Sequence, residues 1–127
     1  MSGNCKCDCS AAPKLIFACS GSADVGALAD QAARKLNRDG DGQMFCTVGI
    51  GGRVSGIMKT TEAAQAILAI DGCPLECVKN CLEEAGFTDF KHLKLADLNM
   101  KKGATEVSEE NIAIISEKGS KMLQEST

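Results

Sequence analysis

Short apolar runs alternate with longer segments of helical periodicity along most of this chain. Residues 15–18, Leu-Ile-Phe-Ala, form a continuous apolar run, the pattern of a strand whose two faces are both covered by helices. The same reasoning predicts strands at 44–48, 66–70 and 90–95. The last of these alternates polar with apolar residues, which indicates a strand near an edge of the sheet.

Helical periodicity fills the intervals between these strands. A serine, Ser20 or Ser22, can cap the first helix, and Ser108 can cap the last. A glycine, Gly86, is expected to end the helix before the fourth strand. The segments predicted to be helical are 23–38, 54–59, 60–65, 74–85 and 108–123.

Strands that alternate with helices predict a three-layer α/β fold with a mostly parallel four-stranded sheet and helices on both faces. We expect the strand order 2-1-3-4. The 127 residues, 44% of them hydrophobic, are enough for one ordinary core but not for two. We therefore expect a single α/β domain over 13–127 and a flexible, cysteine-rich tail over 1–12, which carries Cys5, Cys7 and Cys9.

Charge and hydropathy narrow the classes of partner. A net charge of -3 with scattered basic residues argues against nucleic acid, and no apolar run approaches the roughly 20 residues that cross a membrane. The first residues show neither a basic nor an apolar signal region, so we expect a cytoplasmic protein. Eight cysteines in a cytoplasmic α/β chain favour metal binding or redox chemistry over disulfides, and protein partners stay undetermined.

The stretch from Asp71 to Cys77 carries the strongest chemical signal. An apolar strand leads into Asp71-Gly72, and Pro74 is a residue favoured at the first position of a helix. This would place Cys73 at or beside the helix N-cap, where free N–H groups and the helix dipole stabilise a thiolate. Cys77 would follow one turn later on the same face.

Strand order brings further cysteines to the same place. Ligands bind parallel sheets beyond the carboxyl ends of the strands, and in the order 2-1-3-4 Cys19 and Cys73 would face each other there. Cys46 lies near the end of the second strand, and Cys77 supplies a fourth sulfur. Four sulfurs are the number that a tetrahedral zinc site requires.

These motifs resemble the DGC-domain family, small bacterial and archaeal proteins thought to bind zinc. The likeness covers most of 14–98 and lies in Cys19-Ser20-Gly21, in Cys46 before the glycines at 49–52, and in Asp71-Gly72-Cys73-Pro74 with Cys77. It implies that Cys19, Cys46, Cys73 and Cys77 are the family's zinc cysteines. The family supplies no established reaction.

We thus expect one Zn²⁺ on these four cysteines. Four sulfurs would close the coordination shell, which favours a structural, sensing or metal-carrying role over catalysis by zinc-bound water; three would leave a position open for an enzyme. One alternative is a thiol redox or transfer enzyme with Cys73 as a low-pKa nucleophile, resolved by Cys77 or Cys19. Another is an iron–sulfur cluster on the same thiols.

Other candidate residues carry weaker signals. Cys81 is expected to pack in the core or to serve as a reserve thiol, because it lies two turns from the helix start. The tail cysteines Cys5, Cys7 and Cys9 either capture soft metals or have no role. His92 is expected at the surface or half-buried. Arg53, after the glycines, either holds an anion or is a solvated loop residue.

Overall fold

The computed structural model describes residues 12–125, and its centre is a four-stranded sheet. All strand pairs are parallel and the order is β2-β1-β3-β4, which confirms the predicted sheet order. The strands are β1 (Lys14–Ala18), β2 (Gln43–Met44), β3 (Ala66–Asp71) and β4 (Lys91–Lys94).

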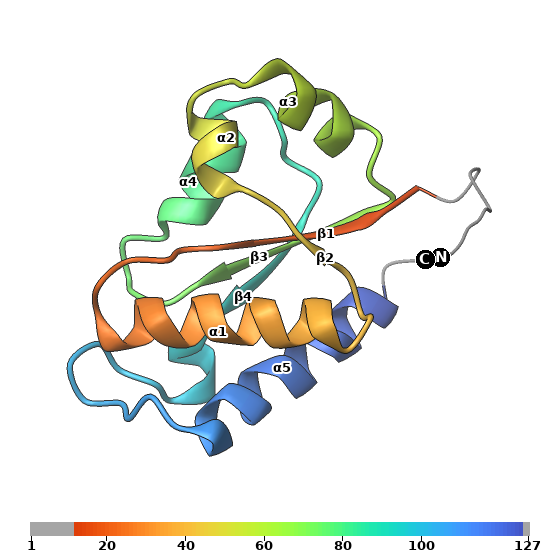
Figure 1. Cartoon of the computed structure of the whole chain (residues 1–127). Helices are drawn as coiled ribbons and strands as arrows, with labels where there is room; N and C mark the ends of the chain where they lie inside the picture. Colours follow the sequence, from red (N-terminus) through yellow and green to blue (C-terminus); the bar gives the residue numbers. More distant parts are fainter. Residues whose placement is uncertain (1–11, 126–127) are drawn as a thin grey trace.

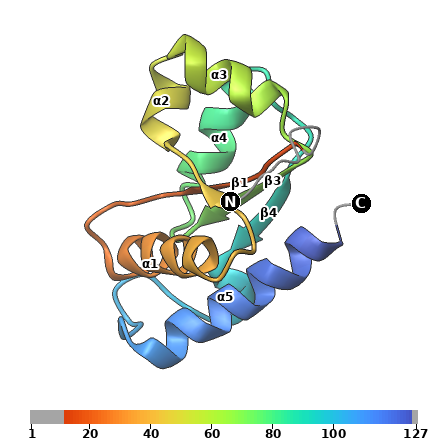
Figure 2. The same ribbon diagram turned by 45° about the vertical axis from the view of Figure 1, so that its right-hand side comes forward.

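Helices cover both faces of this sheet, so the predicted three-layer α/β fold is confirmed (Figures 1 and 2). One face carries α1 (Asp24–Arg38) and α5 (Glu109–Gln124), and a 3₁₀ helix, η1 (Leu95–Leu98), follows β4. The opposite face carries α2 (Thr47–Gly51), α3 (Ser55–Glu62) and α4 (Cys77–Glu84). No helix within 12–125 is long and apolar enough to cross a membrane.

The strands contribute to a separate apolar core on each face. Ile16 and Leu68 point toward α1 and α5, whereas Leu15 and Phe17 point toward α2 and α4. Successive side chains of a strand alternate between faces, so a continuous apolar run fills both cores. This explains why β1 and β3 lack the polar alternation seen in the edge strand β4.

The predicted strand at 44–48 is wrong beyond Met44. The chain leaves the sheet at Phe45, whose N–H donates to the Ile16 carbonyl at 2.8 Å, and Cys46 becomes the N-cap of α2. Gly49 and Gly51 of the glycine-rich segment therefore belong to a helix. In the helical conformation, α2 buries Ile50 against the sheet, and Gly49 packs directly on Ile57 of α3.

Two further predictions of helix boundaries are wrong. The segment predicted as two short helices between 54 and 65 is the single helix α3, in which the Thr60 and Thr61 hydroxyls donate to carbonyls one turn back. The N-cap of α1 is Ala23, whose side chain makes no capping hydrogen bond, so the cap predicted from Ser20 or Ser22 is wrong. The Ser108 cap is confirmed, since its Oγ accepts the Asn111 N–H at 3.2 Å.

Candidate functional site

Three cysteines lie where three neighbouring strands end. Cys19 follows β1 directly, Cys46 lies two residues after β2, and Cys73 lies two residues after β3. Because these strands are parallel and adjacent, their carboxyl ends share one edge of the sheet. The predicted placement of the cysteines at this edge is therefore correct.

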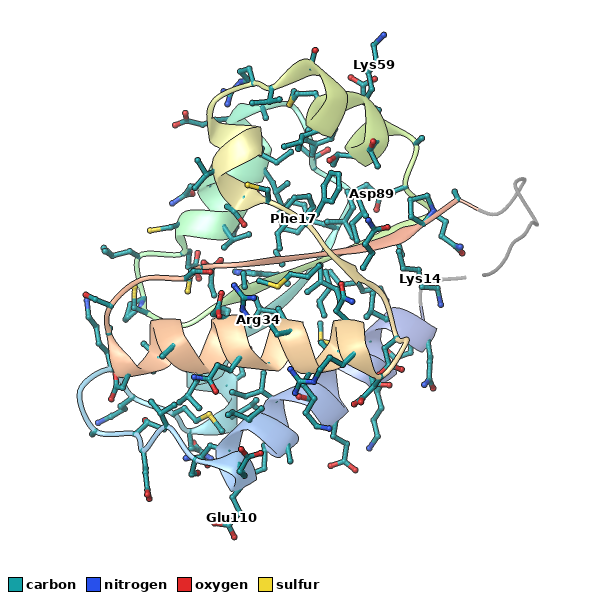
Figure 3. All side chains as sticks on the ribbon, in the orientation of Figure 1. Lys14, Phe17, Arg34, Lys59, Asp89 and Glu110 are labelled. Carbon is teal, nitrogen blue, oxygen red and sulfur yellow. The ribbon has the colours of Figure 1, made fainter. Side chains whose placement is uncertain are left out.

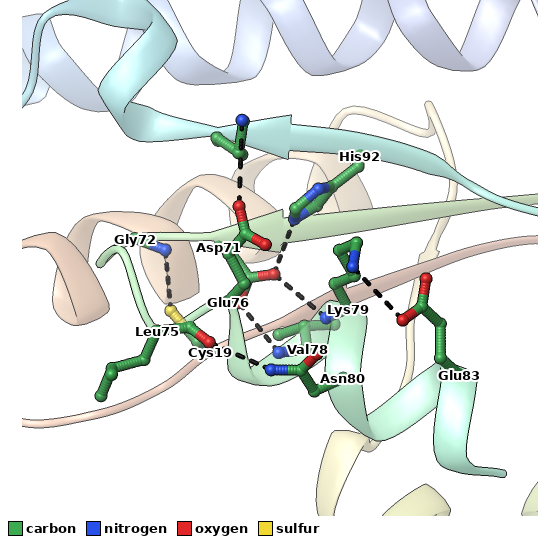
Figure 4. A network of polar contacts seen from close by, with 11 residues as sticks. Cys19, Asp71, Gly72, Leu75, Glu76, Val78, Lys79, Asn80, Glu83 and His92 are labelled. Atoms are coloured by element: carbon green, nitrogen blue, oxygen red, sulfur yellow. Dashed lines mark hydrogen bonds and ion pairs between the residues drawn. The ribbon is translucent and has the colours of Figure 1, made fainter. Parts of the chain in front are cut away.

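Cys19 is held against the loop after β3 by two backbone contacts. Its N–H donates to the Ile70 carbonyl at 3.2 Å, and its Sγ accepts the Gly72 N–H at 3.0 Å (Figure 4). Only glycine fits at position 72, because a Cβ there would lie 2.4 Å from the Val25 carbonyl oxygen of α1. The Asp-Gly step thus brings a backbone donor to the sulfur.

Cys73 does not cap a helix, contrary to the prediction from Pro74. The Cys73 carbonyl accepts the Glu76 N–H at 3.3 Å, which closes a turn with Pro74 at its second position, a place proline also favours. Glu76 then adopts a left-handed conformation (φ 56°), and α4 begins only at Cys77. Cys73 therefore lies outside α4, before the N-cap residue Glu76.

Asp71 caps α4 from the end of β3. Its carboxylate accepts the N–H groups of Val78 at 2.8 Å and Lys79 at 3.1 Å, and it lies 2.7 Å from His92 Nε2 on β4 (Figure 4). The Asp71 side chain is 1% exposed, so these partners replace water around a buried carboxylate. His92 is half-buried as predicted, but its pairing with Asp71 was not foreseen.

The pKa of the Cys19 thiol depends on two of the other predicted ligands. Burial raises the pKa of the Cys19 thiol, nearby Asp71, Cys73 and Cys77 raise it further, and the Gly72 N–H opposes them. Without a cation nearby, Cys19 therefore stays protonated at neutral pH. A cation bound among these groups would reverse that balance and release the proton.

A cleft of about 1060 Å³ exposes Cys19, Cys46 and Cys77 together. Their sulfurs are soft donors of the kind that zinc binds, so the donor chemistry fits the predicted ion. Within residues 12–125, however, no three Cys, His, Asp or Glu side chains lie close enough together to hold a metal as they stand. Metal binding would require these side chains to move toward one another.

The remaining candidates lie elsewhere. Cys81, on α4, is half-buried against the apolar core, and its Sγ lies 3.6 Å from the Thr47 carbonyl oxygen, in agreement with the packing role. The Arg53 guanidinium donates to the carbonyls of Ile50, Gly51 and Glu84, so it joins α2 to α4. Cys5, Cys7 and Cys9 lie outside the described residues.

Comparison with known proteins agrees with this arrangement of motifs. No solved structure is significantly similar. The "Anaerobic and virulence modulator AnvM" of Pseudomonas aeruginosa is 40% identical over 88 residues, which is 69% of this chain and 67% of that protein. The profile of the DGC domain matches residues 15–118. The chain therefore belongs to the DGC-domain family.

Proposed function

We propose that this protein binds one zinc ion through Cys19, Cys46, Cys73 and Cys77 and that the ion serves a regulatory, sensing role. The observation that carries the proposal is that Cys19, Cys46 and Cys73 follow three adjacent parallel strands at one edge of the sheet. Cys77 begins α4 and lines the same cleft as Cys19, whose sulfur already accepts a backbone N–H. Such donors stabilise the negative charge of a thiolate–metal site. When bound, zinc would supply a closed, non-redox centre.

The composition of the two apolar cores favours a sensing role for the ion over a structural one. Both apolar clusters, on the two faces of the sheet, are formed by aliphatic and aromatic side chains, with Cys19 and Cys73 only at their margins. The fold should therefore persist without metal, unlike small domains that unfold when zinc is removed. The name of the Pseudomonas relative, a modulator, is consistent with a regulatory role.

Metal content tests the proposal directly. Protein purified under reducing conditions should contain close to one zinc per chain and be colourless, whereas an iron–sulfur protein would be brown. Serine at position 73 should abolish zinc binding, because the closed shell loses a ligand. Cys81→Ser is the matched control and should retain zinc, since Cys81 packs against the core and does not line the cleft that exposes Cys19, Cys46 and Cys77.

A second measurement separates this proposal from the redox alternative. Removal of zinc by a chelator should leave far-UV circular dichroism and cooperative unfolding largely intact. A protein that never takes up metal, and in which the Cys73 thiolate titrates well below the usual ~8.5, would contradict the zinc proposal and support a thiol enzyme.

A further inference from the structure

The cleft that exposes the cysteines has a second, cationic wall. Arg34 and Arg38 of α1 line it together with Cys19, Cys46 and Cys77. Figure 3 shows Arg34 between α1 and the sheet. The two arginines are four residues apart, so they project from the same face of the helix. The cleft therefore joins two guanidinium groups to three thiols.

Both guanidinium groups have unused donors. Arg34 donates through Nε to Asp30 at 2.7 Å, but no hydrogen bond of its terminal amino groups is found among residues 12–125. The Arg38 guanidinium makes no hydrogen bond or ion pair with any residue of that range. Arginine presents five N–H donors in a planar fork that matches a carboxylate, so the wall can accept an anion.

The charge balance of the cleft also favours an anion. Asp30 is the acidic residue of its lining, and its carboxylate already accepts the Ser20 hydroxyl and the Arg34 Nε, each at 2.7 Å. The lining thus carries two positive charges against one negative charge, in a protein whose net charge is -3. A local excess of positive charge in a cleft concentrates anionic ligands.

We propose that the cleft binds a small anionic thiol. Its carboxylate pairs with Arg38 and the terminal amino groups of Arg34, and its sulfur lies among Cys19, Cys46 and Cys77. A volume of about 1060 Å³ admits a molecule of tripeptide size. The sulfur half of this inference rests on the proposed zinc site. The ligand's thiolate would take the place of Cys73, the one proposed ligand that does not line the cleft, so the ion would keep four sulfurs. The anion half does not depend on metal.

Two probes separate these halves: glutathione, and S-methylglutathione, which keeps the carboxylates but has no free thiol. Titration calorimetry on reduced protein, with and without zinc, gives the affinities. Arg38→Gln should weaken binding of both probes about tenfold, because a charge-assisted pair is lost. Lys59→Gln, which removes one positive charge from α3 outside the cleft (Figure 3), should change neither affinity.

The sulfur half predicts a dependence on metal. Zinc-loaded protein should bind glutathione more tightly than S-methylglutathione, whereas metal-free protein should bind the two equally. Equal binding by zinc-loaded protein would overturn the sulfur half. Unchanged affinities in Arg38→Gln, or no binding of either probe, would overturn the whole inference. If the protein takes up no zinc, Arg38-dependent binding of S-methylglutathione still supports the anion site, so the two failures are distinguishable.

Discussion

Asp71 connects three segments that frame the cysteine site. It ends β3, satisfies two of the N–H groups that the start of α4 leaves unpaired, and contacts His92 on β4. The position of Cys77, the first residue of α4, therefore depends on this carboxylate. Cys73 lies in the bend that Asp71 and α4 enclose.

Replacement of Asp71 by Asn should lower the free energy of unfolding by about 1–3 kcal/mol, because one buried acceptor oxygen becomes a donor that faces N–H groups. Urea unfolding followed by circular dichroism measures the change. Asp89→Asn, at an exposed residue, is the control and should be nearly neutral. Equal stability of the two variants would show that the cap contributes little.

Gly72 should be equally sensitive to the addition of a methyl group. Gly72→Ala places a Cβ against the Val25 backbone, which cannot move without α1, and should cost about 1–3 kcal/mol. Gly56→Ala meets no atom within 4 Å and should stabilise the exposed helix by up to about 1 kcal/mol. Thermal unfolding of both variants measures the difference between their stabilities. Equal stabilities would show that the loop after β3 moves to accommodate the added methyl group.

The sequence was sufficient to locate the cysteines but not the groups around them. Cys19, Cys46 and Cys73 follow apolar strands, and parallel strands end at one edge, so their proximity follows from order alone. The contact of Asp71 with His92 joins residues 21 apart, and no periodicity encodes it. The arginine wall was missed because Arg34 and Arg38 read as an ordinary solvated helix face.

At the scale of elements, helix starts were predicted less well than helix interiors. Pro74 favours both the first position of a helix and the second position of a turn, and local sequence does not choose between them. Contact of Asp71 with Val78 and Lys79 decides the choice in favour of the turn. Likewise Ser22, a good capping residue by type, makes no cap, whereas Ser108 does.

This difference between the two serines is measurable. Ser108→Ala should reduce the free energy of unfolding by about 0.5–2 kcal/mol, since the Asn111 N–H loses its acceptor. Ser22→Ala should change it by less than about 0.5 kcal/mol. Chemical denaturation of the two variants in parallel is the test, and a larger loss in Ser22→Ala would contradict the assigned N-caps.

At the scale of the whole molecule, Asp24 ties the segment before α5 to the start of α1. Its carboxylate accepts the N–H groups of Gly103 at 2.9 Å and Thr105 at 3.1 Å. These hydrogen bonds lower the pKa of Asp24. Residues about 80 positions apart in the sequence are thereby joined, on the face of the sheet that α1 and α5 cover (Figure 2).

The contribution of Asp24 to stability should depend on pH. Because its pKa is lower in the folded protein than in the unfolded chain, its contribution is present at neutral pH and is lost as pH falls through the folded-state pKa. At pH 7 the wild-type protein should therefore unfold at a higher urea concentration than Asp24→Asn. This difference between the two unfolding midpoints should shrink below about pH 4. A difference independent of pH would exclude these hydrogen bonds as its source.

The left-handed residue Glu76 determines how Cys73 and Cys77 could act as a chelating pair. On a continuous helix, the helix pitch fixes the distance between the sulfurs of two cysteines four residues apart. Tetrahedral zinc needs sulfurs about 3.8 Å apart, because Zn–S bonds are about 2.3 Å long. Here only Cys77 belongs to α4. The distance between the two sulfurs would thus be set by the turn from Cys73 to Glu76 and not by the pitch of α4.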